Sequence, residues 1–224
     1  MRDSKAIGAI AGLAIVGAWS AIYFSSHGGF GPTINAKPHE AAGQVLAQQA
    51  LTLLKPGGQV TVIARDTAAF KNPASDLLLG SLRKTLRQGR APVALQLLQV
   101  DPLRPVEVPT GDFFELIRKT PKGSVIVSLM GPPLLSETQR KQLGEINPGI
   151  VAFCSGSLTE QVDLRTLFDQ GLLNAAVVSR QTPVRGSLSP GDLRGCFDQW
   201  FLAVTSATAS SIPLQTQSHS GLSP

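Results

Sequence analysis

Apolar and polar positions alternate along the chain in two periods, one typical of strands and one typical of helices. Five apolar runs of strand length predict β-strands at residues 59–64, 93–100, 124–129, 150–154 and 174–179. Most of these runs are apolar on both faces. This pattern is typical of parallel strands that lie between two layers of helices.

Segments with helical spacing lie before the first run and between the others. Residues 40–54 and 76–88 each carry an apolar stripe, and Leu78, Leu82 and Leu86 form the second stripe. Apolar side chains at i, i+4 and i+8 predict a helix that buries one face.

Capping signals predict the next three helices. A third helix follows Thr110, and Ser136 with Gln139 has the form of a capping box that opens a fourth. Thr159 suits the cap of a fifth helix, which we expect to end at Gly171.

A sixth helix is predicted to start at Ser189 and Pro190, which suit the N-cap and first helical positions. Its inward face would carry Phe197, Trp200, Phe201 and Val204. Strands that alternate with helices form a parallel sheet with right-handed crossovers. We therefore expect an α/β fold, a three-layer, doubly wound domain with a five-stranded, mainly parallel sheet.

The N-terminal segment indicates a membrane helix. Arg2 and Lys5 precede an uncharged apolar run over residues 6–24, and about 20 such residues cross a bilayer as a helix. Trp19 and Tyr23, near the far end of the run, suit the membrane interface. The run predicts an uncleaved signal anchor at residues 1–24. The basic residues place the N-terminus in the cytoplasm and the main domain outside it, in the periplasm.

Other interpretations of this segment stay open. One is a cleaved secretory signal, although the run exceeds the usual apolar core of about 7–15 residues and no clean cleavage site follows it. Gly8 and Gly12 form one G-x-x-x-G pattern, which lets two membrane helices approach closely. Because glycine and alanine fill the segment, a chance match is the competing explanation.

Composition divides the rest of the chain into three parts. Residues 25–38 are rich in glycine, serine and proline and predict a flexible tether. Residues 39–205 form the predicted α/β domain, and residues 206–224 are small, polar and predict a disordered tail.

The net charge is +5, but basic residues are scattered and only 5% of residues are aromatic. Because single-stranded nucleic acid is bound on aromatic platforms beside basic grooves, we expect no nucleic-acid partner.

The two cysteines are predicted to be buried thiols. Cys154 lies in an apolar strand and Cys196 in an amphipathic helix, where a free cysteine packs as a small hydrophobe. A disulfide is the alternative, since the periplasm permits one.

The histidines argue against catalysis. His27 and His219 lie in the tether and the tail, and His39 lies at the very start of the domain. With no histidine expected near the strand-end loops, we expect no catalytic triad, no Cys–His pair and no histidine zinc site. No glycine-rich nucleotide motif is present either. We expect a non-catalytic protein with no cofactor and no metal site.

Polar residues follow the predicted strands. In parallel sheets, ligands bind beyond the carboxyl ends of the strands. The candidate ligand-binding residues in these loops are Arg65, Asp66, Asn72, Asp101, Gly131, Ser155, Gly156 and Arg180.

These loops suit an anion or a polar solute. Arg65 or Arg180 could pair with a carboxylate or a phosphate. The backbone amides of Gly156 and Ser157, ahead of a predicted helix, could hold an anion. The competing explanation is that these polar residues only end strands and cap helices.

One family resemblance covers about half of the chain. Its residues are the strand QVTVIA with its loop RDTAAFKNP, the helix LLLGSLRKTLRQ and the strand SVIVSLMGPP. This stretch, from Gln59 to Arg180, resembles one lobe of the type I periplasmic ligand-binding proteins. The resemblance implies an exported α/β lobe that binds a sugar or a similar small solute between two lobes. By position, the loops at residues 66–72 and 131–133 would face the ligand. Since this chain has room for one lobe, a closing trap would require a homodimer.

Two functions follow from these patterns. The first is a membrane-anchored, extracytoplasmic binding or sensing domain for a small polar or anionic solute. The second is a non-catalytic scaffold or interaction subunit of a cell-envelope protein complex, which predicts an exposed apolar patch or an uncovered sheet edge. A former enzyme that kept its fold and lost its site is a third alternative.

Overall fold

A computed structural model describes residues 34–68, 71–99, 107–144, 148–156, 162–184 and 192–209. The chain divides into two units between Asn35 and Ala36, and the second unit carries all the elements below. The predicted anchor, most of the tether, most of the tail and the candidate residue Asp101 lie outside the described residues. No helix within the described ranges is both long and apolar enough to span a membrane.

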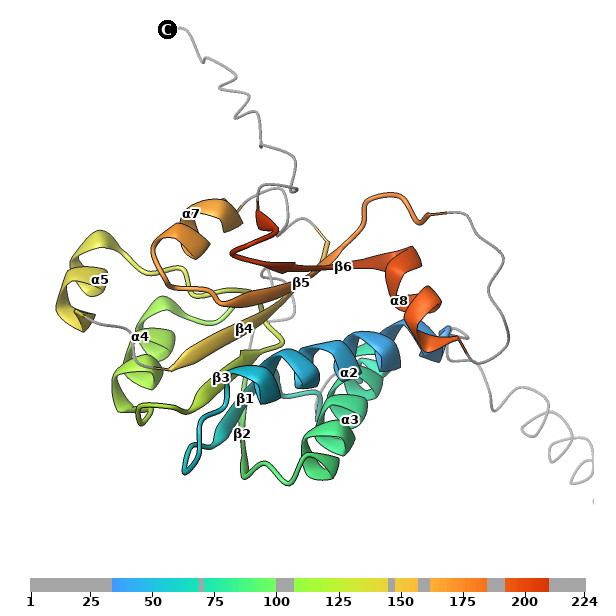
Figure 1. Ribbon diagram of the computed structural model, residues 1–224, viewed down its shortest axis with the longest axis horizontal. Coiled ribbons are helices and arrows are strands. Elements are labelled where there is room, and N and C mark those ends of the chain that lie inside the picture. Colours follow the sequence, from blue (N-terminus) through green and yellow to red (C-terminus); the bar gives the residue numbers. More distant parts are fainter. Residues whose placement is uncertain are drawn as a thin grey trace, which may run out of the picture. The chain divides into compact units, whose positions relative to one another are not determined.

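The unit is a six-stranded sheet with helices on both sides (Figure 1). The helices are α2 (Ala36–Leu53), α3 (Pro73–Gln88), α4 (Thr110–Lys119), α5 (Glu137–Leu143), α7 (Leu164–Asp169) and α8 (Leu193–Trp200). The strands are β1 (Val60–Arg65), β2 (Val93–Leu98), β3 (Val125–Ser128), β4 (Gly149–Cys154), β5 (Ala175–Ser179) and β6 (Phe201–Thr205). The mixed α/β class and the mainly parallel sheet that the sequence predicts are confirmed.

The strand order is β2-β1-β3-β4-β5-β6. The first five strands pair in parallel, and β6 pairs antiparallel with β5. From β1 the chain moves outward to β2, and from β3 it moves in the opposite direction to β5. The connections therefore reverse between β1 and β3, which is the switch point where doubly wound sheets bind ligands.

Side chains alternate between two apolar clusters because successive residues of a strand face opposite sides. In β4, Val151 packs against the layer of α2, α3 and α8, whereas Ile150 and Ala152 pack against the layer of α4, α5 and α7. Figure 1 shows the two helix layers on opposite sides of the sheet. The three-layer arrangement agrees with the prediction from strands that are apolar on both faces.

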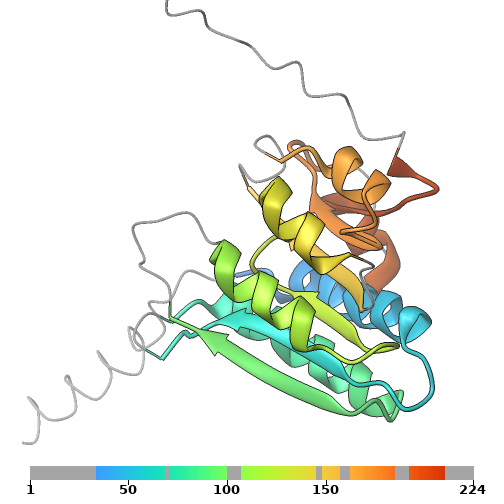
Figure 2. The same ribbon diagram turned by 90° about the vertical axis from the view of Figure 1, so that its left-hand side faces the viewer.

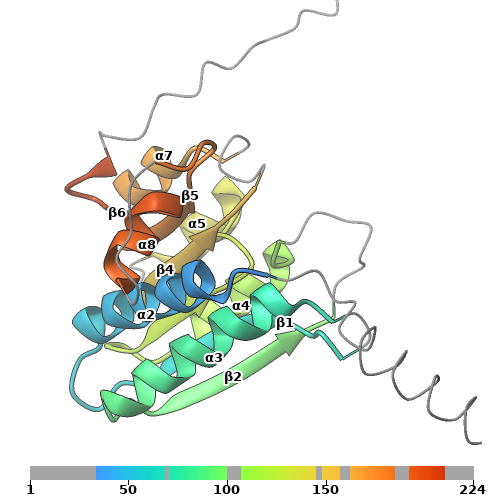
Figure 3. The same cartoon turned by 90° about the vertical axis from the view of Figure 1, so that its right-hand side faces the viewer.

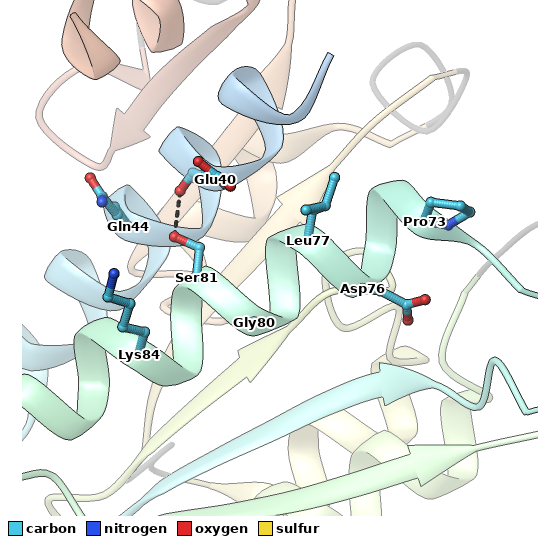
Figure 4. A pocket seen from close by; sticks show the side chains of 8 residues that line it. All are labelled: Glu40, Gln44, Pro73, Asp76, Leu77, Gly80, Ser81 and Lys84. Atoms are coloured by element: carbon cyan, nitrogen blue, oxygen red, sulfur yellow. Dashed lines mark hydrogen bonds between the residues drawn. The ribbon is translucent and has the colours of Figure 1, made fainter. Parts of the chain in front are cut away.

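Helices α2 and α3 pack closely. A Cβ atom at Gly43 of α2 would collide with the backbone oxygen of Leu78 and would lie 2.9 Å from the backbone nitrogen of Leu82, both in α3. The Ser81 hydroxyl also donates to the backbone oxygen of Glu40 across the same contact, at 2.7 Å (Figure 4). The missing side chain at Gly43 therefore lets the two helices touch.

Two predictions are wrong for the same reason: the sheet has six strands instead of five, and the predicted sixth helix ends earlier than expected. Helix α8 stops at Trp200, and Phe201 takes extended angles of φ −133° and ψ 166°. Phe201 and Val204 belong to β6 and pair with Ser179 and Ala176 of β5. The stretch FLAVT is apolar, aromatic and β-branched, so it fits a pleated strand once β5 offers a free edge.

The predicted fifth helix also begins later than expected. Val162 and Asp163 are not helical, and α7 starts at Leu164. The carboxylate of Asp163 caps it by accepting from the Thr166 backbone N–H at 3.2 Å. The capping box at Ser136 and Gln139 of α5 is confirmed. Thr159, Ser189 and Pro190 lie outside the described residues.

Both cysteines are free and buried, as predicted. Cys154 packs in the cluster of α4, α5 and α7, while Cys196 belongs to α8 on the opposite side of the sheet. The sheet therefore separates the two thiols. Burial raises the pKa of the Cys154 thiol to about 12.

Candidate functional site

A cavity of about 360 Å³ lies at the carboxyl ends of the strands. The ends of four strands reach it through Ala64 of β1, Leu129 after β3, Phe153 of β4 and Ser179 of β5. The N-terminal parts of α2 and α3 and the end of α8 also contribute residues. The cavity thus covers the reversal point between β1 and β3, where such sheets bind ligands.

Five of the eight candidate residues line this cavity: Arg65, Asn72, Ser155, Gly156 and Arg180. They come from three loops that are far apart in the sequence, and parallel strands bring them together because their ends meet at one edge. Asp66 and Gly131 are not part of the lining, and Asp101 lies outside the described residues.

Local structure accounts for the two candidates that lie elsewhere. The carboxylate of Asp66 accepts from the Ala68 backbone N–H at 2.9 Å, so it shapes its own turn. Gly131 is buried with φ 88°, a conformation that favours glycine. The preceding Met130 packs in the cluster of α4, α5 and α7, away from the cavity layer.

Arg65 ends β1 with an unpaired donor. Its Nε atom is buried and has no hydrogen-bond partner among the described residues. The ion pairs of the described ranges join Glu115, Glu137 and Asp198 to cations on their own helices, so Arg65 takes part in none of them. A buried donor without a partner costs about 1–3 kcal/mol.

Arg180 is held by the end of helix α8. Its Nε donates to the backbone oxygen of Asp198 at 2.9 Å and to that of Phe201 at 3.2 Å. The last carbonyls of a helix lack partners within the helix and carry partial negative charge, so they suit a guanidinium group. The guanidinium of Arg180 is therefore fixed in place at the cavity.

His39 of α2 also lines the cavity, and sequence reasoning missed it. The expectation of no histidine near the strand-end loops is wrong. Helix α2 leads into β1 and runs back along the sheet, since its last turn at Leu53 lies against Gly149 at the start of β4. Its first turn must then lie at the carboxyl edge. Burial lowers the pKa of His39 below its ordinary value.

Aromatic rings form one wall of the cavity. Phe153, Trp200 and Phe201 all contribute to the lining, and the rings of Phe153 and Phe201 lie 5.7 Å apart between centroids. Trp200 keeps 40% of its surface exposed. Rings of this kind offer flat apolar area to a ligand beside the polar groups.

Several other polar groups of the lining have partners within the protein. Asn72 accepts from the Ser75 backbone N–H at 3.2 Å and caps α3. Asp76 accepts from the Thr67 hydroxyl at 3.0 Å. The Gly156 backbone N–H donates to the Ser179 hydroxyl at 3.2 Å, so this amide is engaged within the protein. Ser157, the other amide considered for an anion, lies outside the described residues.

A second hollow of about 610 Å³ runs along the outside of α2 and α3. Its lining comes from these two helices and includes Glu40, Gln44 and Lys84 (Figure 4). Neither the strand ends nor the two cavity arginines contribute to it. The first cavity is therefore the better candidate site. In the described part of the chain, no three histidine, cysteine or acidic residues gather as metal ligands.

No protein-family model matches this chain, and no curated protein matches it. Solved structures share its fold. An arabinose-binding protein from Geobacillus stearothermophilus aligns with a TM-score of 0.51 at 14% identity, over 79% of this chain and 63% of that one. A sugar-binding protein of a sugar ABC transporter from Bacillus halodurans aligns with a TM-score of 0.52 at 13% identity, over 78% and 64%.

At these identities the likeness concerns the fold. The predicted resemblance to a lobe of type I periplasmic ligand-binding proteins is confirmed at that level. The chain spans less than two thirds of the length of either structure, 63% and 64%.

Proposed function

We propose that this chain is a non-catalytic binding or sensing domain for a small polar or anionic solute. The observation that carries the proposal is the cavity at the switch point, which gathers two arginines, one histidine and an aromatic wall. Its volume of about 360 Å³ lies near the small end of the range of about 300–1,000 Å³ for ligand pockets. The sugar-binding function of the proteins with the same fold is consistent with such a solute.

A solute screen by thermal unfolding tests this function. A ligand that binds only the folded chain raises its melting temperature, so at least one solute among sugars, sugar acids, amino acids and small phosphates should do so. Ser155 lies exposed at the cavity, and Ser155→Trp should remove the shift by filling the site. Thr138→Trp, on exposed α5, is the matched control and should keep it. A panel without any shift would contradict the proposal.

We also propose that residues 1–24 anchor the domain to the cell membrane with the cavity on the extracytoplasmic side. The apolar run behind Arg2 and Lys5 supports this location. Deleting residues 2–24 should move the protein from the membrane fraction to the soluble fraction. A full-length chain that already leaves the membrane in carbonate wash would contradict the anchor.

A second candidate function, an interaction subunit of an envelope complex, rests on strand β2. This strand ends the sheet, and among the described strands none pairs with its outer edge (Figures 2 and 3). Leu95 and Leu97 of β2 are 38% and 50% exposed. Charged residues, proline and bulges usually protect such an edge. The sequence of β2, VALQLL, contains no charged residue and no proline.

One partner that this edge would accept is a second copy of the chain. In antiparallel self-pairing about a two-fold axis, each residue of β2 faces another residue of β2, and like charges would repel. Because β2 is uncharged, it carries no such penalty. Light scattering of the full-length chain in detergent should give a dimer that Leu97→Lys converts to a monomer. Val184→Lys, at an equally exposed site outside β2, is the control. A monomeric parent chain would exclude this arrangement.

A further inference from the structure

The cavity carries an excess of positive charge that its own side chains leave uncompensated. Its charged lining consists of the guanidinium groups of Arg65 and Arg180 and the carboxylate of Asp76, with His39 as a further titratable group. Asp76 is turned to Thr67, whose hydroxyl donates to it at 3.0 Å. Neither arginine belongs to the ion pairs of the described ranges, which lie within helices α4, α5 and α8.

The two arginines have different surroundings. The Nε of Arg180 is satisfied by two backbone oxygens of the α8–β6 junction, so this residue is fixed and supplies charge. The Nε of Arg65 is buried and has no acceptor among the described residues. Because this atom is buried, a solute reaches Arg65 through the terminal nitrogens of its guanidinium group, since the residue as a whole is half-buried and lines the cavity. A guanidinium group pairs best with a planar, two-oxygen anion that accepts in parallel.

We infer that the solute of this cavity carries one carboxylate, which Arg65 binds, beside an apolar ring face that lies on Phe153 and Trp200. The ligand class is a small hydroxylated acid, such as a sugar acid. Two guanidinium groups and one carboxylate leave the lining with one positive charge in excess, which a monoanion neutralises. A dianionic phosphate would leave negative charge in excess. This inference rests on the proposed solute-binding function and narrows it.

Matched pairs of solutes test this ligand class. The full-length chain is melted with D-glucuronate or D-galacturonate and with the neutral parents D-glucose and D-galactose, at constant ionic strength. At least one uronate should raise the melting temperature, and its neutral parent should require a concentration about tenfold to a hundredfold higher for the same shift. This factor follows from the loss of a hydrogen bond to a charged group.

Arg65→Gln tests whether the charge of Arg65 serves solute binding or the stability of the fold. It should weaken uronate binding by about tenfold to a hundredfold and should weaken binding of the neutral parent by a clearly smaller factor. Without ligand, this variant should melt no lower than the parent chain, because it removes a buried Nε donor that lacks an acceptor. Lys84→Gln removes the same charge from the outer hollow and should leave every shift unchanged.

Three other results would contradict the carboxylate inference, each in a different way. If a neutral sugar binds as well as its acid, and Arg65→Gln binds both equally, the carboxylate inference is wrong and the solute-binding function stands. If neither acids nor sugars bind, the inference falls, and the wider panel decides whether the function falls with it. If Arg65→Gln melts much lower without ligand, Arg65 serves the fold and not the solute.

Discussion

The two faces of the sheet reach the carboxyl edge in different ways. On the side of α4, α5 and α7, which we call the closed face, the apolar cluster continues past the strand ends through Met130. The residues after it, 131–133, are buried as well. On the side of α2, α3 and α8, which we call the open face, the cluster ends with residues such as Val127 and Val177. The next residues on this side of the two strands, Leu129 and Ser179, line the cavity.

This difference arises from single residues along the same strands. In β4, Cys154 packs into the closed face, while its neighbour Phe153 lines the cavity. In β5, Val178 is part of the closed cluster and Ser179 lies at the open site. Because neighbours in a strand face opposite sides, one sheet can keep a continuous core on one side and a binding site on the other.

The largest expected effect compares one phenylalanine from each face. Phe113 of α4 is fully buried in the closed cluster, so Phe113→Ala should lower the free energy of unfolding by about 3–5 kcal/mol. Phe153 already borders the cavity, and Phe153→Ala should cost only about 1–2 kcal/mol, since it enlarges a space that exists. Denaturant unfolding of both variants measures the two losses. Equal losses would mean that the open face is as tightly packed as the closed one.

The next comparison uses two glycines of the open layer. Gly43→Ala should cost about 1–3 kcal/mol, because its Cβ would meet the backbone of α3 at Leu78 and Leu82. A Cβ atom at Gly80 of α3 would meet nothing within 4 Å. Gly80→Ala should therefore stabilise the chain by about 0.5–1 kcal/mol, the usual gain in a helix interior. Thermal unfolding of both variants gives the signs, and a stable Gly43→Ala would show that the two helices can separate freely.

Much of this fold is predictable from the sequence because the buried strands are continuous apolar runs. The first run predicts a strand at residues 59–64, and β1 is Val60–Arg65. The same argument fails for β6, since FLAVT continues the apolar spacing of α8. Only its pairing with β5 decides between helix and strand, and one sequence does not contain that information.

The site is predictable in part for a similar reason. Parallel strands end at one edge, so loops such as those at Arg65 and Arg180 are expected to meet, and both line the cavity. Gly131 follows β3 as predicted but lies away from the cavity lining, because the direction of a loop depends on packing. Sequence reasoning missed His39 since it precedes the first strand, although a helix that leads into β1 must start at the carboxyl edge.

Two helix caps offer a smaller comparison. Asn72 caps α3 at the cavity, and Asp163 caps α7 on the closed face. Asn72→Ala and Asp163→Ala should each cost about 0.5–2 kcal/mol, the usual value of such a cap. Only Asn72→Ala should also weaken solute binding, because Asn72 lines the cavity and Asp163 does not. Unfolding curves with and without solute measure both effects, and equal binding in the two variants would place the solute away from α3.

The smallest expected effect is the pH dependence that His39 confers on the open face. Burial lowers the pKa of His39 in the folded chain below its ordinary value of 6.5, so the unfolded chain takes up this proton first. The stability associated with neutral His39 is present above pH 6.5 and is lost as the pH falls through the folded pKa. The melting temperature should therefore decline more steeply toward acid in the parent than in His39→Gln. Because His39 remains partly exposed, the difference should be modest, and identical slopes would show that the imidazole at the cavity stays in contact with water.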